Sequence, residues 1–571
     1  MAVRWGEWGE AAFARARAEG KPVLLSLTAS WCHGCHRMEE ETWEAPGIDA
    51  VVEATAVPVR VDADARPDVH GRYHLGGLPT TAMLTAQGDF IRGGTFFSPP
   101  QLLAFLESGL ADFRAGRRPG PRARPAPGQP PRLVEAVVAR LIQRADLAHG
   151  GFGAAPKLPE TEALTLLLRH WRARGDGAGE RILRLSLDAI AERLADPVAG
   201  GFFRYAAAED WSGPHTEKVA ADQAALIRLF LEAHGALAVP AYLAVARSAL
   251  AHARRRLADA DGRVFASVAA DPVYHSRLAT ERLREAEGGA DRLRGEAGGR
   301  DESPAGAEDP SADEPPVDCR RFSDAAAGML SAGLLAWSHT GEDPGFATEF
   351  MGAASGGMIP HRLDAPGSPG GLLRDQAMGL RAAVDAYRLR GSGEALRWAE
   401  RVAAWSLEHL WDEPAGAFRD APPAAAGEPS LPPMLPLLAN GEMALALAEL
   451  SDHAGRPELR ELAGRVVRSL GGEAVRSPAG AALALAAQRL ESEPPEADLE
   501  GDPADPRARA LARVVVAALG PTAVVRWRGG AAASLALCVR DLCLPPIEDP
   551  AELLRSLVEL DLAPAGLAVP L

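Results

Sequence analysis

Apolar positions change their spacing along this chain, and the change near residue 132 separates two kinds of fold. Before it, short apolar runs such as 23–27 and 56–62 alternate with amphipathic segments, as strands and helices do in an α/β domain. After it, apolar residues recur at helical spacing over long segments. We therefore predict an α/β domain over residues 1–115 and an all-α domain over residues 132–495.

Eleven segments of the second region have helical periodicity, and a short twelfth helix is expected near 346–356. Twelve helices make six antiparallel pairs, which can close into an (α/α)6 toroid whose loops line a central cavity at one end. An open α-solenoid is the alternative arrangement. The predicted helices cover 132–147, 160–174, 178–195, 218–236, 239–257, 323–340, 372–390, 393–411, 433–452, 455–470 and 476–492.

Three segments depart from these two patterns. Residues 116–131 are rich in Pro, Gly and Arg, which cannot hold a helix, so we expect a linker. Residues 280–318 are acidic and poor in large apolar side chains, and we expect them to be disordered. Residues 510–571 contain β-like runs at 512–516 and 523–527 and a last helix, which predicts a small α/β segment.

Length and charge narrow the class of protein. A chain of 571 residues is too long for one hydrophobic core, so several domains are expected. The formal net charge of −16 argues against a nucleic-acid partner. No apolar run reaches the roughly 18 residues of a membrane span, and the first residues do not form a signal peptide. The chain has only five cysteines, so we expect a cytoplasmic protein in a reducing compartment. We also expect no membrane partner.

The motif with the most defined chemistry is the run from Trp31 to His36, which contains Cys32 and Cys35. A run of strand length precedes it and a helix-forming run follows, so the cysteines lie on a strand-to-helix turn. Cys32 is then at a helix N-terminus, where unpaired N–H groups and the helix dipole lower the pKa of a thiol. Cys35, one turn later, is placed to resolve a mixed disulfide.

A second loop supports the same chemistry. Gly77-Leu78-Pro79 comes before a strand-like run, where a thioredoxin fold places a cis-proline loop that faces the dithiol. The motif therefore predicts thiol–disulfide exchange with a protein partner, at a Cys32 sulfur that is reachable from solvent. The predicted catalytic residues are Cys32 and Cys35, and the supporting residues are Trp31, His33, His36 and Pro79.

Other interpretations of the cysteines stay open. A zinc cluster of Cys32, His33, Cys35 and His36 is disfavoured, because adjacent residues rarely point at one tetrahedral centre. Two inert thiols are a further alternative. The pair Cys538 and Cys543 is consistent with a second redox pair, a local disulfide or ordinary half-buried thiols. Cys319 is most simply a stray thiol. No metal site and no cofactor are predicted.

The loops of the helical region contain aromatic and ionisable residues near the expected helix ends. Aromatic rings stack on sugar rings, and carboxylates or histidines move protons, so these loops suit a carbohydrate ligand. The same Gly-Gly-Phe turns are also consistent with simple helix caps, and Glu217 with Lys218 with a surface ion pair. The candidate cavity residues are Phe152, Lys157, Tyr205, Trp211, His215, Glu217, Lys218, Asp222, Asp375 and Glu442.

On these motifs the sequence resembles a family of thioredoxin-domain proteins that includes bacterial YyaL-type proteins and the animal spermatogenesis-associated protein. The matching segments are the dithiol motif, Gly77-Leu78-Pro79, the loops 150–159, 201–205 and 214–222, and the closing 538–550. The resemblance implies a thioredoxin-like domain joined to a six-hairpin-glycosidase-like (α/α)6 domain, akin to that of sugar epimerases.

The sequence also departs from that family. Gly34 stands where the family usually has Trp between the cysteines, and Leu78 stands where it has Trp before the proline. Asp318-Cys319-Arg320-Arg321 and Ala325-Ala326-Gly328 replace the family's Asp-Asp-Lys and Trp-Asn-Gly signature, which removes polar groups from one cavity wall. Two functions remain in view: a thiol–disulfide oxidoreductase or redox-responsive protein, and a carbohydrate-active or carbohydrate-binding toroid with a structural or regulatory thioredoxin-like domain.

Overall fold

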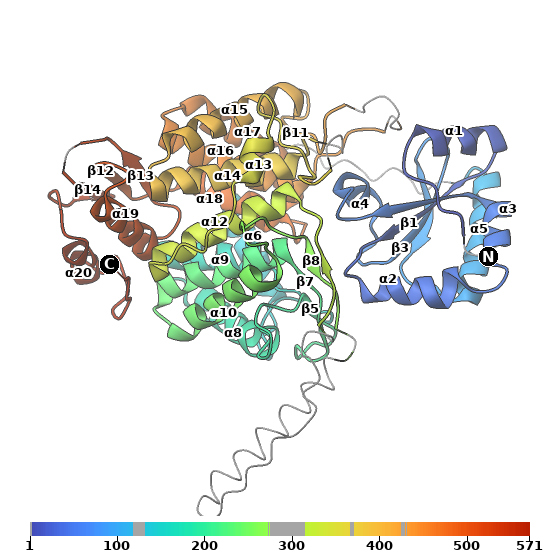
Figure 1. Cartoon of the computed structure of the whole chain (residues 1–571), viewed down its shortest axis with the longest axis horizontal. Helices are drawn as coiled ribbons and strands as arrows, with labels where there is room; N and C mark the ends of the chain where they lie inside the picture. The colour runs from blue at the N-terminus through green and yellow to red at the C-terminus, as the bar shows by residue number, and fades with distance from the viewer. Residues whose placement is uncertain are drawn as a thin grey trace, which may run out of the picture.

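The computed structural model describes most of the chain and shows three units along its long axis (Figure 1). The predicted linker 116–131 and the predicted disordered insert 280–318 fall largely outside the described residues, so both stay predictions. The structure describes residues 3–117, 132–271, 273, 314–365, 370–423, 429, 431–530 and 532–570.

The first unit is a thioredoxin-like domain built on a four-stranded sheet of order β2-β1-β3-β4. β1 pairs parallel with β2 and antiparallel with β3, and β3 pairs antiparallel with β4. The strands are β1 (Val23–Thr28), β2 (Val57–Asp62), β3 (Thr80–Leu84) and β4 (Phe90–Gly94). The helices are α1 (Glu10–Glu19), α2 (His33–Met38), α3 (Ile48–Thr55), α4 (Pro67–Tyr73) and α5 (Pro99–Arg114), and a π-helical turn, Glu39–Trp43, continues α2.

Alternation along β1 explains the layers of this domain. Leu25 and Leu27 point into a core formed with α1 and α4, and Leu24 points into a second core formed with α2, α3 and α5. Both faces of the sheet are therefore covered, so β1 is apolar on both sides. This arrangement places the end of β1, and the dithiol after it, at one edge of the domain.

The second unit contains the helices that the periodicity predicts, with ends that differ by a few residues. Its inner helices are α7 (Thr161–Arg174), α9 (Ala220–Leu237), α12 (Ser323–Thr340), α14 (Leu373–Arg390), α16 (Leu437–Ala454) and α18 (Gly480–Glu491). Its outer helices are α6 (Leu133–Arg144), α8 (Gly177–Arg193), α10 (Pro240–Arg256), α13 (Glu349–Ala353), α15 (Gly393–His409) and α17 (Pro457–Ala474).

The inner helices form a closed ring. Each packs against the next along the chain, and α18 packs against α6 and α7, which joins the last helix to the first. Inner helices are buried along nearly their whole length, as in α12, whereas outer helices such as α15 bury one stripe. The predicted toroid is confirmed, and this closure excludes the open solenoid.

The third unit is a small α/β segment at the opposite end of the ring from the thioredoxin-like domain (Figure 1). Its sheet has the order β13-β12-β14-β15. The elements are β12 (Glu496–Glu500), α19 (Pro506–Leu519), β13 (Val524–Trp527), β14 (Ser534–Val539), β15 (Leu542–Cys543) and α20 (Pro550–Glu559). Cys538 and Cys543 form a disulfide between β14 and β15.

The strand predicted at 512–516 is wrong, because these residues belong to α19. The helix packs against α9, α12 and α14 on one side and against its own sheet on the other. A helix covered on both sides is mostly apolar around its circumference, and the valine-rich run from 514 to 516 then looks like a buried strand.

Short strand pairs form the loops that lead into the inner helices. They are β5 (Tyr205–Ala206), β6 (Pro214–His215), β7 (Lys218–Val219), β8 (Ser267–Val268), β9 (Val317–Asp318), β10 (Trp411–Asp412) and β11 (Ala417–Phe418). We call the end of the ring where the inner helices begin the mouth. In the described part of the chain, every helix is too short or too polar to cross a lipid bilayer.

Candidate functional site

The thioredoxin-like domain rests on the mouth of the ring, through polar contacts that come from different loops. Ser30 donates a hydrogen bond of 2.5 Å to Asp318, and Arg320 pairs with Asp62 at 3.0 Å. His361 bonds the carbonyl oxygen of Asp64 at 2.7 Å. Asp318 and Arg320 belong to the segment that departs from the family signature, so this departure supplies contacts between the domains.

The dithiol has the local geometry that the motif predicts. Cys32 is the N-cap of α2, and its Sγ accepts a hydrogen bond of 3.2 Å from the backbone N–H of Cys35. The peptide bond between Leu78 and Pro79 is cis. A Cβ atom at Gly34 would lie only 3.3 Å from Cδ of Pro79, so the proline loop packs directly on the dithiol turn.

The prediction that the Cys32 sulfur faces an open groove is wrong. Cys32 is 4% exposed and Cys35 is 5% exposed. Both pack in a small apolar cluster with Trp31, and Val219 from the helical domain packs against the same cluster. We call residues 204–219, which contain β5, β6 and β7, the covering segment. This segment could not be placed from the sequence, because the contact joins distant parts of the chain.

The hydrogen bond between the two thiols is the main cause of their pKa shifts. A hydrogen bond with Cys35, followed by burial, raises the pKa of the Cys32 thiol. The same bond lowers the pKa of Cys35. The N–H group at the helix N-terminus favours a Cys32 thiolate, but this contribution is smaller. In the docked arrangement of the domains, the pKa of Cys32 is therefore shifted in the direction opposite to the one predicted from the motif.

Trp31 is the central side chain of the domain contact. Its indole N–H donates a hydrogen bond of 2.8 Å to Asp64, and the guanidinium of Arg204 lies 3.8 Å from the ring centre. Burial, together with the charge of Asp62, raises the pKa of Asp64 to about 7. A cation over an indole ring is attracted by the ring's quadrupole, so Arg204 fastens the covering segment to the dithiol motif.

Glu217 lies in the covering segment beside the dithiol. Glu217 is 3% exposed, and its Oε2 has no hydrogen-bond partner among the described residues. Its Oε1 is 4.0 Å from Nδ1 of His215, whose ring stacks on Tyr205 with centroids 4.1 Å apart. Burial raises the pKa of Glu217, and burial together with the charge of Glu217 raises the pKa of Tyr205 to about 12.

The other predicted cavity residues fall into two groups. Lys157 is 0% exposed and bonds Asp146 and two backbone carbonyls, and Lys218 bonds Asp196 and the carbonyl of Gly200. Phe152 and Trp211 are core residues. These four hold the loops and do not line the mouth. Asp222 and Glu442 lie on inner helices near the mouth, and Asp375 is buried against His361.

Arg374 at the start of α14 is a mouth residue that the sequence did not single out. Its side chain is 43% exposed, although it lies on an inner helix, and its Nε is 3.7 Å from Glu442 and 3.9 Å from Asp324. Burial raises the pKa of Glu442, and the charge of Arg374 opposes this shift. Nothing in the local sequence separates Arg374 from the many surface arginines of this chain.

His361 is a second residue that the sequence did not identify. Its Nδ1 is 3.0 Å from Asp375, and its Nε2 bonds a carbonyl oxygen of the other domain. Burial alone would lower its pKa, but the charge and hydrogen bond of Asp375 raise it to about 10. Asp324, His361 and Asp375 lie close enough together to hold a metal ion, but both ring nitrogens already have protein partners.

The zinc cluster considered at the dithiol is not formed within the described residues. Cys32 and Cys35 are buried, whereas His33 and His36 are exposed on the first turn of α2. The four side chains therefore do not converge on one centre.

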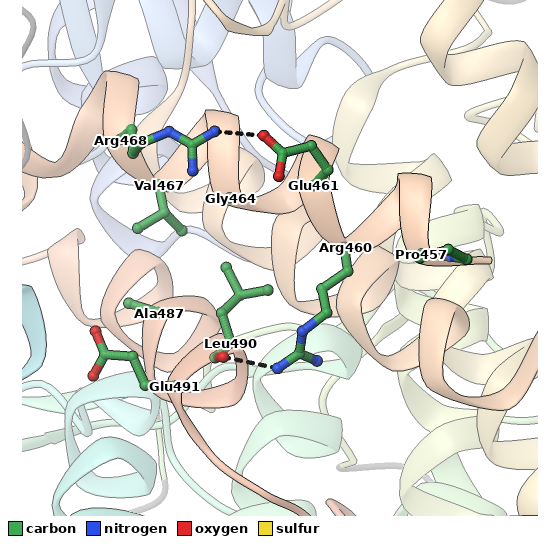
Figure 2. Close-up of a pocket in the computed structure, with 9 residues that line it drawn as sticks. All are labelled: Pro457, Arg460, Glu461, Gly464, Val467, Arg468, Ala487, Leu490 and Glu491. Atoms are coloured by element: carbon green, nitrogen blue, oxygen red, sulfur yellow. Dashed lines mark hydrogen bonds and ion pairs between the residues drawn. The ribbon is translucent and has the colours of Figure 1, made fainter. Parts of the chain in front are cut away.

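Three cavities differ in their position relative to this site. One, of about 350 Å³, lies along the contact between the domains; its lining includes Ser30, Trp31, Asp62, Ser267, Asp318 and Arg320. A second, of about 610 Å³, lies between the ring and the C-terminal unit. A third, of about 360 Å³, is the groove between α17 and α18 (Figure 2). In it Arg468 pairs with Glu461, and Arg460 bonds the carbonyl of Leu490.

Comparisons with known proteins agree with the resemblance drawn from the sequence. Residues 1–108 match the family Thioredox_DsbH, described as "Protein of unknown function, DUF255". Human spermatogenesis-associated protein 20 is 30% identical over 306 residues, 47% of this chain. The match covers 39% of the human protein, so it spans about two fifths of that relative.

Two further similarities concern single domains. The thiol:disulfide interchange protein DsbD of Cronobacter sakazakii is 35% identical over 103 residues, which are 17% of this chain and 18% of DsbD. A cellobiose 2-epimerase structure from Spirochaeta thermophila matches 59% of this chain and 82% of that chain, with 14% identity and a TM-score of 0.44.

Proposed function

We propose that this protein is a thiol–disulfide redox protein in which Cys32 exchanges with a disulfide and Cys35 resolves the mixed disulfide. The observation that carries the proposal is the dithiol itself, with Cys32 at the N-cap of α2, Cys35 in hydrogen-bond contact and the cis-Pro79 loop packed against the turn. The similarity of the N-terminal domain to DsbD supports it. We also propose a cytoplasmic location.

The covering segment limits which disulfides reach the sulfur. A folded protein needs an open surface around Cys32, and in the docked arrangement Val219 and Arg204 occupy that surface. A small disulfide needs only a local opening, and the cavity of about 350 Å³ beside Trp31 offers space of that scale. We therefore propose that small disulfides react with the docked protein and that protein disulfides react only after the domains separate.

Reduction of two model disulfides by the full chain tests the proposal. The Cys319→Ser background removes the exposed free thiol, and Cys538→Ala with Cys543→Ala removes the hairpin disulfide, so that only the dithiol reacts. We expect the pre-reduced protein to reduce an aromatic disulfide such as dithiobis-nitrobenzoate, and to reduce insulin much more slowly. Cys32→Ser should abolish both reactions. A Cys32→Ser variant that reduces either disulfide at the unchanged rate would contradict the proposed role.

A carbohydrate ligand at the mouth is the second candidate function, and Arg374 is the observation that favours it. Its half-open guanidinium lies between Asp324 and Glu442, and a pair of carboxyl groups, one of them with a raised pKa, is the kind of arrangement that acid–base sugar chemistry uses. A thermal-shift screen of mono- and disaccharides tests it. A shift that is lost in Glu442→Gln and kept in Cys32→Ser would support this function, and no shift with any sugar would oppose it.

A further inference from the structure

The side chain of Glu217 has no evident structural purpose where it lies. Buried carboxylates in proteins usually have hydrogen-bond or ion-pair partners, because an unpaired buried charge is strongly destabilising. Glu217 is 3% exposed, one of its oxygens has no hydrogen-bond partner in the described chain, and the other lies at the limit of contact with His215. Such a group indicates a function that offsets its cost.

Glu217 faces the dithiol across the contact between the domains. Val219, two residues later in the same segment, packs on the cluster that contains Cys32. The charge of Glu217 raises the pKa of the Cys32 thiol, although less than Cys35 and burial do, and the charges of Glu217 and Cys32 both raise the pKa of Tyr205. The ionisable groups that face Glu217 from the surrounding elements are Cys32, Arg204, Tyr205, His215 and Asp222.

We propose that Glu217 exchanges a proton with Cys32, so that the helical domain supplies part of the dithiol's active site. The inference rests on the proposed thiol–disulfide function and adds a residue to it. In the docked protein, the thiol that must attack is the one that holds its proton more strongly, and a buried carboxylate on the same domain contact can accept that proton.

The step balances without a further reagent. The Cys32 sulfur attacks a disulfide R–S–S–R′, its proton passes to ionised Glu217, and R′S⁻ leaves with the electron pair of the broken bond. Glu217 then returns the proton to give R′SH. Cys35 attacks the sulfur of Cys32, and RS⁻ leaves and takes the Cys35 proton. Two electrons pass from the dithiol to the substrate, and Cys32 and Cys35 become a disulfide.

The pH dependence of Cys32 alkylation by iodoacetamide tests the proton exchange without turnover. In the reduced Cys319→Ser protein we expect two coupled steps, because Cys32 and Glu217 titrate together. In Glu217→Gln a single step should remain, because the second titrating group is gone. Glu209→Gln is the matched control, since it makes the same change at an exposed position of the covering segment.

The rate of aromatic disulfide reduction gives a second readout. We expect Glu217→Gln to slow it about tenfold or more at pH 7, with recovery at higher pH, where Cys32 ionises without help. A profile identical to that of Glu209→Gln would overturn the role of Glu217, and so would a loss that is equal at every pH. If the unmodified site reduces no disulfide at all, the proposed function fails, and the alkylation profile still decides whether Glu217 is coupled to Cys32.

Discussion

Lys157 and Lys218 are rare residues in this arginine-rich chain, and the structure gives both a structural role. Each ammonium lies under a Gly-Gly-Phe turn and joins an aspartate to backbone carbonyls. A compact ammonium with three donors fits such a buried pocket better than a planar guanidinium. Their positions in motifs could be read from the sequence, but the direction of their side chains could not.

Removal of one buried ammonium should destabilise the helical domain strongly. Lys218→Met leaves Asp196 buried without its cation, so we expect a loss of about 3–5 kcal/mol in the free energy of unfolding. Urea unfolding followed by circular dichroism measures it. Lys21→Met is the control, because Lys21 pairs with Glu19 at the surface, where a pair contributes about 0–1 kcal/mol. Equal effects of the two changes would contradict this account.

His361 should make stability depend on pH in the alkaline range. Its pKa is raised from 6.5 to about 10, so the folded protein favours the protonated ring. Its contribution is complete below about pH 6.5 and is lost as the pH rises through about 10, with a slope of at most about 1.4 kcal/mol per pH unit. Thermal unfolding between pH 7 and 10 should therefore show a steeper decline for the unmodified protein than for His361→Gln. Parallel declines would show that the ring does not titrate as described.

Local motifs predicted the backbone geometry around Cys32 and Cys35 correctly, because this geometry is set by neighbours in sequence. The turn between β1 and α2, the N-cap at Cys32 and the cis-Pro79 loop each depend on a few adjacent residues. Arg204, Glu217 and His361 were not assigned to this site because their contacts with it are tertiary. Ser30 and Asp318, which form one of these contacts, are 288 residues apart in the chain.

At the scale of helices and strands, helical periodicity located the helices of the ring well. It failed for the buried helix α19. An amphipathic helix carries its own signature, but a helix covered on both faces does not. The hairpin of β14 and β15 is a further element with an undecided feature. The spacing of its two cysteines did not decide whether they form a disulfide. The hairpin holds the disulfide Cys538–Cys543, which is unusual in the reducing compartment that we expect.

The hairpin disulfide should contribute modestly and locally. A bridge between Cys538 and Cys543 closes a very short loop, so its removal costs about 2 kcal/mol in the chain-entropy description. Cys538→Ala with Cys543→Ala should lower the stability of the C-terminal unit by that amount and leave the rate of Cys32 alkylation unchanged. Hydrogen exchange resolved by segment can measure the local stability of the C-terminal unit and of the dithiol region in one experiment. A slower or faster Cys32 reaction in this variant would connect the two cysteine pairs.

For the whole molecule, the position of the small domain on the mouth controls access to the dithiol. We expect a small alkylating reagent to modify Cys32 in the Cys319→Ser protein faster than a bulky maleimide does. Arg204→Ala removes the cation over Trp31, a contact of about 1 kcal/mol, and should raise the undocked population and the bulky reagent's rate about fivefold.

Arg465→Ala provides the matched control for that change. Arg465 also lies over an indole ring, that of Trp411, but within the helical domain. It should leave the rate with both reagents unaltered. If Arg204→Ala and Arg465→Ala behave alike, the domain contact does not govern the reactivity of Cys32.

The ring itself has little open passage along its axis. Arg228, Asp385, Arg388 and Glu449, from three inner helices, meet in a buried network of ion pairs, and α19 lies beyond them. A molecule held near Arg374 would therefore enter and leave on the side where the small domain sits. The docked domain then closes this entrance. Undocking of the small domain would admit or release such a molecule and would also expose the sulfurs of Cys32 and Cys35. Both processes would therefore have the same rate constant.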